Sequence, residues 1–378
     1  MESPSGSPYS QLKPKRKLPR QGQQLPPLPY VASTIEGRSA GEVFRETGTA
    51  MVEELQELRR TLHRYPEIGL ELPRTQKAVL NALEGLPLEI TLGQDLSSVT
   101  AVMRGGKRGE RPVSVLLRAD MDALAVKERT GSPFASTNEY MHACGHDLHT
   151  AALVGAAQIL SKHREEVAGD VIFMFQPGEE GPGGADIMID EGVLDVAGRR
   201  PIAAYGLHVG PQDRGTFHYI NGPTMASSSN LAVTVYGKGG HGSRPHDAVD
   251  PVTCLAEIIT SLQTAITRRF DALEPIVLTV TNLRAGDGAF NAIPDQASFS
   301  ATVRVLRDEQ INAVRQVIGE VTSNIAAAHR CSVEVDFEVL YPTTKTNARE
   351  NQFAATVWGA QFGPDSIRQF EAPTIVII

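Results

Sequence analysis

The residues best suited to chemistry are concentrated between Met141 and Thr150. This stretch reads Met-His-Ala-Cys-Gly-His-Asp-Leu-His-Thr and holds three of the ten histidines and one of the three cysteines of the chain. Cys144 and His146 lie two residues apart, and thiolate and imidazole are preferred ligands of Zn²⁺ and related divalent metals. The spacing indicates a metal site whose further ligands must come from other parts of the chain.

Two later segments offer such ligands. Glu179 and Glu180 follow an apolar run at 170–175, and His208 lies within a short apolar run at 205–209 that we interpret as a strand. Adjacent carboxylates allow one glutamate to bind a metal while the other accepts a proton from a water molecule whose pKa the metal lowers. A charged surface turn would explain the glutamate pair alone, and a buried structural histidine would explain His208 alone.

A third strand end carries two aspartates. The apolar run 113–117 leads into Arg118-Ala-Asp120-Met-Asp122, and ligands bind at the carboxyl ends of strands in open α/β sheets. Metal-bound histidines usually donate their other ring proton to a carboxylate, a role that suits Asp122. The alternative is that both aspartates only cap a loop.

Helical patterns separate these strands. Apolar residues at three- and four-residue steps predict helices at 43–62, near 75–86 and directly after the Cys144 motif. Alternating strands and helices are typical of a doubly wound α/β sheet, so we predict such a domain with its site along the strand ends.

The pattern changes after Gly222. Strands at 231–235, 276–283, 297–306 and 331–339, with helices at 251–268 and 309–327, give the order β-α-β-β-α-β of a ferredoxin-like unit. We therefore expect an α+β domain at 225–340, inserted between a first part (43–224) and a second part (341–378) of the α/β domain. Residues 1–42 are expected to form a disordered extension, because they are rich in Pro, Gly, Ser and Gln.

Polar residues of the expected second domain are also candidates. His241 lies in the glycine-rich segment 237–243, and Arg304 lies in an otherwise apolar strand, where an arginine fork suits a substrate carboxylate. Asn291 is the third candidate. For each residue alone, a surface or structural role is the alternative.

Composition limits the classes of function. The net charge of −8 argues against a nucleic-acid binder, although a basic cluster at Lys13–Arg20 leaves a nucleic-acid or membrane role for the extension as an alternative. No run of 18 or more apolar residues predicts a membrane helix. Three widely spaced cysteines favour a reduced, cytoplasmic protein over a disulfide framework.

Four motifs occur here in an order that resembles a known family. They are Leu-Arg118-Ala-Asp-Met-Asp122-Ala-Leu, Met-His142-Ala-Cys-Gly-His146-Asp, Gln-Pro-Gly-Glu179-Glu180 and Gly-Gly-His241-Gly-Ser. They are similar to those of the M20 metallopeptidase clan, in particular its N-acyl-amino-acid amidohydrolases, which include hippurate hydrolases, auxin-conjugate hydrolases and aminoacylase-like enzymes. The segment His63-Arg-Tyr-Pro-Glu67 also resembles that subgroup, and the likeness covers about residues 50–374.

The resemblance implies a catalytic domain with two divalent metal ions, Mn²⁺ or Zn²⁺ with Co²⁺ or Ni²⁺ as alternatives. It implies metal ligation by Cys144, His146, Glu180 and His208, with Glu179 as general base and acid. Asp122 would hold a ligand or the bridging water. The inserted domain would act as a lid and dimerise, its His241 would stabilise the oxyanion in the partner's site, and Asn291 and Arg304 would contact the substrate carboxylate. The implied substrate is an N-acyl amino acid.

The sequence departs from the family at its carboxyl end. The family's last metal-ligand histidine lies beyond a Ser-Glu-Asp-Phe segment, whereas this chain reads Glu371-Ala-Pro-Thr374, then Ile375–Ile378, and no histidine follows His329. We therefore expect a C-terminally truncated member without the fifth ligand. Two alternatives to the amidohydrolase stay open: a dipeptidase of the same clan, and a catalytically impaired remnant.

Overall fold

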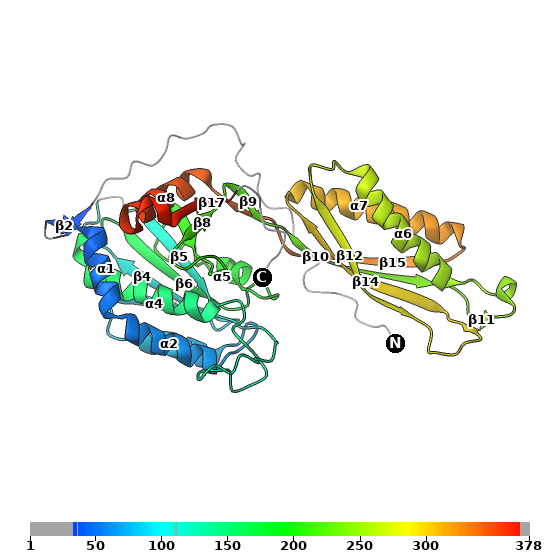
Figure 1. Cartoon of the computed structure of the whole chain (residues 1–378), viewed down its shortest axis with the longest axis horizontal. Coiled ribbons are helices and arrows are strands. Elements are labelled where there is room, and N and C mark those ends of the chain that lie inside the picture. Colours follow the sequence, from blue (N-terminus) through cyan, green and yellow to red (C-terminus); the bar gives the residue numbers. More distant parts are fainter. Residues whose placement is uncertain (1–32, 36, 110–111, 371–378) are drawn as a thin grey trace.

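The structure is a computed structural model that describes residues 33–35, 37–109 and 112–370. Its elements form two lobes joined by a narrow connection (Figure 1). The first lobe contains a five-stranded mixed sheet, and the second lobe, residues 228–341, contains a four-stranded antiparallel sheet. The protein is therefore of the mixed α/β class.

The first-lobe sheet places the candidate strand ends side by side. Its order is β3-β4-β6-β5-β7. β5 pairs in parallel with both β6 and β7, whereas β4 pairs antiparallel with both β3 and β6. The strands are β3 (Leu88–Leu92), β4 (Val99–Arg104), β5 (Ser114–Asp120), β6 (Asp170–Gln176) and β7 (Ala203–Gly206). Since β5, β6 and β7 are parallel neighbours, their carboxyl ends meet at one edge of the sheet.

Both faces of this sheet are covered. Val171, Phe173 and Phe175 of β6 join one apolar core, and Ile172 and Met174 join another, because successive side chains of a strand point to opposite faces. The first core packs against α3 (Pro73–Leu83) and α4 (His146–Lys162), and the second against α5 (Gly184–Asp190). All seven residues of β6 are buried, which explains why its sequence is almost continuously apolar.

The second lobe has the element order β10-α6-β12-β14-α7-β15, with sheet order β12-β14-β10-β15. Alternate residues of β10, such as Leu231, Val233 and Val235, are buried against the two helices, while the other face of the sheet is more exposed. The elements are β10 (Ser228–Tyr236), α6 (Pro251–Arg269), β12 (Ile276–Ala285), β14 (Gln296–Val305), α7 (Asp308–Ala328) and β15 (Ser332–Tyr341). Short strands β11 (Gly240–His241) and β13 (Ala292–Ile293) pair in the connections of this lobe.

The chain crosses between the lobes twice. It leaves through β9 (Gly222–Met225) and returns through β16 (Thr344–Thr346), and these two strands pair with each other. It continues into α8 (Ala348–Phe362) and β17 (Ile367–Gln369), which pairs with β8 (Phe217–Tyr219). The last described elements therefore belong to the first lobe.

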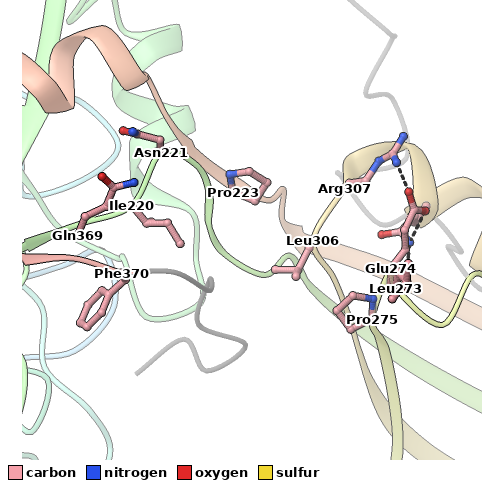
Figure 2. A pocket seen from close by; sticks show the side chains of 11 residues that line it. Ile220, Asn221, Pro223, Leu273, Glu274, Pro275, Leu306, Arg307, Gln369 and Phe370 are labelled. Atoms are coloured by element: carbon pink, nitrogen blue, oxygen red, sulfur yellow. Dashed lines mark hydrogen bonds and ion pairs between the residues drawn. The ribbon is translucent and has the colours of Figure 1, made fainter.

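A cavity of about 580 Å³ lies beside this crossing. Figure 2 shows Ile220, Gln369 and Phe370 on its first-lobe side and Pro275 and Arg307 on its second-lobe side. None of the residues singled out from the sequence lines this cavity. The cavity lies between the two lobes next to their connection, and its lining includes none of the candidate metal ligands.

Several local predictions need correction. The single helix expected at 43–62 is two helices, α1 (Ala40–Ala50) and α2 (Val52–Arg64), separated at Met51. The strand expected at 205–209 ends at Gly206, so His208 lies in the loop that follows β7. α1 begins inside the range expected to be disordered, while residues 1–32 and the divergent ending at 371–378 lie outside the described residues.

None of the helices in the described part of the chain combines the length and apolar character needed to cross a membrane.

Candidate metal centre

The candidate ligands of the first lobe meet at the carboxyl ends of β5, β6 and β7. Gly145 precedes α4 in the left-handed backbone conformation (φ 83°), which glycine adopts without strain, and His146 is the first residue of that helix. Glu179 and Glu180 follow β6, and His208 follows β7. Three separate loops thus deliver side chains to one place.

A first group consists of Cys144, His146 and His208. Their candidate ligand atoms all lie within 4.8 Å of one another, and the Cys144 Sγ is 3.3 Å from the His208 Nε2. The His208 Nδ1 lies 2.5 Å from the Val209 carbonyl oxygen, to which it donates a hydrogen bond. This leaves the Nε2 of His208 as the ring nitrogen with a lone pair facing Cys144.

His146 also belongs to the two other groups. Its Nε2 lies 3.9 Å from carboxylate oxygens of both Glu179 and Glu180. With Asp120 and His149 it forms a third group of candidate ligand atoms within the same 4.8 Å limit. His146 is therefore the central side chain of the site.

Four buried polar atoms of the site lack hydrogen-bond partners within the described part of the chain. Both ring nitrogens of His146, the Oδ1 of Asp122 and the Oε1 of Glu180 are buried and make no hydrogen bond there. Buried polar atoms normally have hydrogen-bond partners. A cluster of buried nitrogen and oxygen atoms without such partners is explained by a cation that they would ligate. The residues present therefore fit a divalent metal centre.

The electrostatics of the site support the same conclusion. Burial alone favours a neutral imidazole, but Asp122, Cys144 and Asp120 outweigh it and raise the pKa of His146 to about 11. Burial, and then the charge of Glu180, raise the pKa of Glu179 to about 7. The site thus attracts positive charge and disfavours further negative charge, as expected where several carboxylates converge.

Asp122 lies beside the predicted ligands. Its Oδ1 is 3.5 Å from the His146 Nδ1, and its Oδ2 accepts a hydrogen bond from the Glu180 backbone N–H at 2.9 Å. One carboxylate therefore contacts both the imidazole and the loop that carries the glutamates.

The structure brings the strand-end residue Asp120 into contact with His149, for which the sequence predicted no role. The His149 Nδ1 donates to the Asp120 Oδ1 at 2.6 Å, and its Nε2 accepts from the Val209 N–H at 2.8 Å. His149 therefore joins the end of β5 to the loop of His208. The signal in the sequence was its position three residues after His146, on the same side of a helix.

A second buried cluster lies next to the site. Asp147 is fully buried and forms ion pairs of 2.7 Å with His63 and Arg59, and His63 also approaches Glu128. Burial opposes ionisation of Asp147, yet its hydrogen bond from His63 and nearby positive charges keep its pKa low. The sequence signals for this cluster were the segment beginning at His63, which resembles the family's amino-terminal signature, and Asp147 at the end of the Cys144 motif.

Two of the three candidates of the second lobe lie apart from this centre. His241 and Asn291 come together, since the Gly242 N–H donates to the Asn291 carbonyl at 2.7 Å, and both residues are exposed. They lie by β11, at the end of the second lobe that is remote from β5 and β6 (Figure 1). Arg304 lies on β14, and burial lowers the pKa of its guanidinium.

A buried cluster of thiolate, imidazole and carboxylate groups at parallel strand ends, with a second glutamate beside it, defines the class of metal-dependent hydrolases. The family description "Peptidase family M20/M25/M40" matches residues 116–373. This chain belongs to that family.

Similar proteins agree with this assignment. The chain is 35% identical over 319 residues to an N-acetylcysteine deacetylase of Bacillus subtilis, which covers 84% of this chain and 82% of the relative. It is 36% identical over 288 residues to an N-acyl-L-amino acid amidohydrolase of Geobacillus stearothermophilus, covering 75% of each. A Bacillus subtilis structure described as a dinuclear metal-binding peptidase of the M20 family matches with a TM-score of 0.73 and 30% identity, covering 86% of this chain and 84% of that one.

Proposed function

We propose that this protein is a metal-dependent amidohydrolase that cleaves the amide bond of N-acyl amino acids. The observation that carries the proposal is the convergence of Cys144, His146 and His208 with the Glu179-Glu180 pair at adjacent strand ends. Membership of the M20 family and the names of its similar proteins support an amide substrate with an amino-acid leaving group.

We propose that the site binds two divalent metal ions, Mn²⁺ or Zn²⁺ with Co²⁺ or Ni²⁺ as alternatives. Their ligands would be Cys144, His146, Glu180 and His208. When bound, such ions lower the pKa of a water molecule and polarise a carbonyl oxygen. The unsatisfied buried atoms of His146 and Glu180 support these assignments. Asp122 would fix the orientation of the His146 ring from its Nδ1 side.

Glu179 is the residue that we assign to proton transfer. Burial and the charge of Glu180 raise the pKa of Glu179 to about 7 in the metal-free protein, which favours proton uptake by its carboxylate. Its carboxylate would accept a proton from the attacking water and then deliver that proton to the nitrogen of the leaving amine. A general base with a pKa near the working pH performs both steps efficiently.

The second lobe would act as a lid and dimerisation domain. His241 and Asn291 are exposed and remote from the metal centre of their own chain, so we propose that the partner subunit's His241 stabilises the oxyanion. Asn291 and Arg304 would bind the substrate carboxylate, and the planar guanidinium suits a two-point contact with a carboxylate. We retain the cytoplasm as the proposed location, because an odd number of widely spaced cysteines suits a reducing compartment.

The substitution Glu179→Gln tests this function. It keeps the size of the side chain but removes the base, so we expect loss of at least about 1000-fold in kcat with unchanged metal content. Metal content is measured by elemental analysis, and turnover with N-acetyl and N-benzoyl amino acids is compared with turnover of dipeptides. Preference for dipeptides would favour the dipeptidase alternative, and a metal-loaded wild-type chain inactive on both classes would favour the impaired remnant.

A further inference from the structure

One hydroxyl group connects the second lobe to the loop that carries the glutamates. Tyr341 is the last residue of β15, and the chain returns to the first lobe directly after it. Its hydroxyl donates a hydrogen bond to the Glu179 carbonyl oxygen at 2.6 Å and accepts one from the Gly181 N–H. Both bonds join residues about 160 positions apart in the sequence, across the connection between the lobes.

The backbone of this loop is held from two sides. The Glu180 N–H donates to Asp122 at the end of β5, while the groups on either side of it, the Glu179 carbonyl and the Gly181 N–H, bind Tyr341. Gly181 has a φ of 122°, a conformation that side chains with a Cβ rarely adopt. The loop is thus a tight turn fixed by one side chain from each lobe.

The side chain of Glu179, in contrast, is not fixed by hydrogen bonds of its own. Within the described part of the chain its carboxylate accepts none, and its nearest ionic neighbour is His146 at 3.9 Å. The location of this carboxylate is therefore determined mainly by the backbone from which it extends. Whatever holds the Glu179 peptide group also sets the distance between the base and the site.

We propose that Tyr341 is a positioning residue for Glu179, and that through it the second lobe controls where the general base lies. Because Tyr341 pairs with Ser228 at the junction of β10 and β15, a change in the orientation of the second lobe changes the position of its hydroxyl. The loop of Glu179 would follow that hydroxyl, so movement of the lobe and placement of the base are coupled. This inference rests on the proposed function of Glu179.

The test compares Tyr341→Phe with Tyr236→Phe. Tyr236 lies on β10 of the same sheet and its hydroxyl binds the exposed Glu334, so the control removes a tyrosine hydroxyl of the same lobe far from the loop. We expect Tyr341→Phe to lower kcat on the order of tenfold, with KM and metal content within about twofold of the wild type, because two hydrogen bonds to the loop are lost. Tyr236→Phe should resemble the wild type in every measurement.

Hydrogen–deuterium exchange of the segment 178–184 gives a second measurement that does not depend on turnover. In the wild type the Gly181 N–H donates to Tyr341 and, at 2.9 Å, to the Glu179 carbonyl. Its exchange should therefore accelerate by about threefold in Tyr341→Phe, where the second bond remains, and stay unchanged in Tyr236→Phe. Unchanged exchange in Tyr341→Phe would overturn the proposal. So would faster exchange with unchanged kcat, or a lower kcat explained by lost metal or by a lowered melting temperature.

The exchange experiment also separates this inference from the proposed function. If the wild type hydrolyses no amide but Gly181 exchanges faster in Tyr341→Phe, the assignment of Glu179 fails while the tether by Tyr341 holds. If Glu179→Gln abolishes turnover but Tyr341→Phe changes neither exchange nor kcat, the proposed function stands and the positioning role is wrong.

Discussion

The innermost polar residues of the first-lobe site and the two candidates at the far end of the second lobe lie in opposite environments. Asp120, Asp122 and His146 of the first lobe are at most 1% exposed and face one another, whereas His241 and Asn291 of the second lobe are exposed, beside a fully exposed Phe290. Converging buried carboxylates need a cation for stability, but exposed residues need no partner within their own chain. The difference is consistent with our proposal that the first lobe holds the chemistry and that the second lobe contacts substrate or another copy.

Among the substitutions that test this comparison, the largest effect is expected where the first-lobe site and the exposed His241 must cooperate. His241→Ala should lower kcat about 100-fold, the typical cost of losing an oxyanion donor, without changing metal content. If the partner subunit's His241 serves each site, mixing inactive Glu179→Gln and His241→Ala proteins should restore activity, to about a quarter of the wild-type value for random exchange into symmetric dimers. Activity is followed after subunit exchange under mild denaturant.

A matched mixture provides the control for this experiment. Glu179→Gln mixed with a Glu179→Gln/His241→Ala double variant contains no subunit with an intact base and should stay inactive. No recovery in the first mixture, despite exchange shown by mass labelling, would place the function of His241 within its own chain or remove it from the mechanism.

The next largest effect concerns the buried ion cluster. Asp147→Asn leaves Arg59 and His63 without their buried carboxylate partner, so we expect the free energy of unfolding to fall by about 3 kcal/mol. Urea unfolding of the metal-free protein measures this loss. Asp186→Asn, on the exposed side of α5, is the control and should change stability by less than about 0.5 kcal/mol. Equal effects of both substitutions would show that the cluster contributes little.

A smaller effect distinguishes the two contacts of His149. In His149→Asn the side-chain amide N–H replaces the Nδ1 and can still donate to Asp120. In His149→Gln the longer side chain places its amide oxygen near the Nε2 position, where it can still accept from the Val209 N–H next to His208. If His149 mainly holds the loop of His208, His149→Asn should weaken metal binding about 10- to 100-fold and His149→Gln should weaken it less. Competition with a chromogenic chelator measures both affinities, and the reverse order would assign the main role to the contact with Asp120.

The smallest effect concerns the return of the chain from the second lobe. Burial opposes ionisation of Asp308, but hydrogen bonds from Lys345 and Thr343 outweigh it and lower its pKa. A lowered folded-state pKa stabilises the protein above the unfolded-state pKa, and this stability is lost as pH falls through the folded-state value. We expect Asp308→Asn to remove up to about 1 kcal/mol at neutral pH and less in acid, measured by urea unfolding across that range. The same loss at every pH would contradict this account.

Much of the first lobe was predictable from local patterns. The run 170–175 was apolar because β6 is buried on both faces, and the ligand types in the Cys144 motif indicated a metal before any fold was known. The loop position of His208 was not predictable, because an apolar run alone does not show where pairing with β5 stops. There the backbone of Val209 binds His149 and His208 in place of a neighbouring strand.

The sequence by itself determined the chemistry available to this protein: a thiolate, imidazoles and paired carboxylates, each at or near the end of an apolar segment. Only the tertiary structure decided how they combine. The adjacency of β5, β6 and β7, the contact of Asp120 with His149 and the bonds of Tyr341 to the Glu179 loop all join distant residues. Local periodicity records which face of an element is buried, but which elements meet depends on packing across the whole chain.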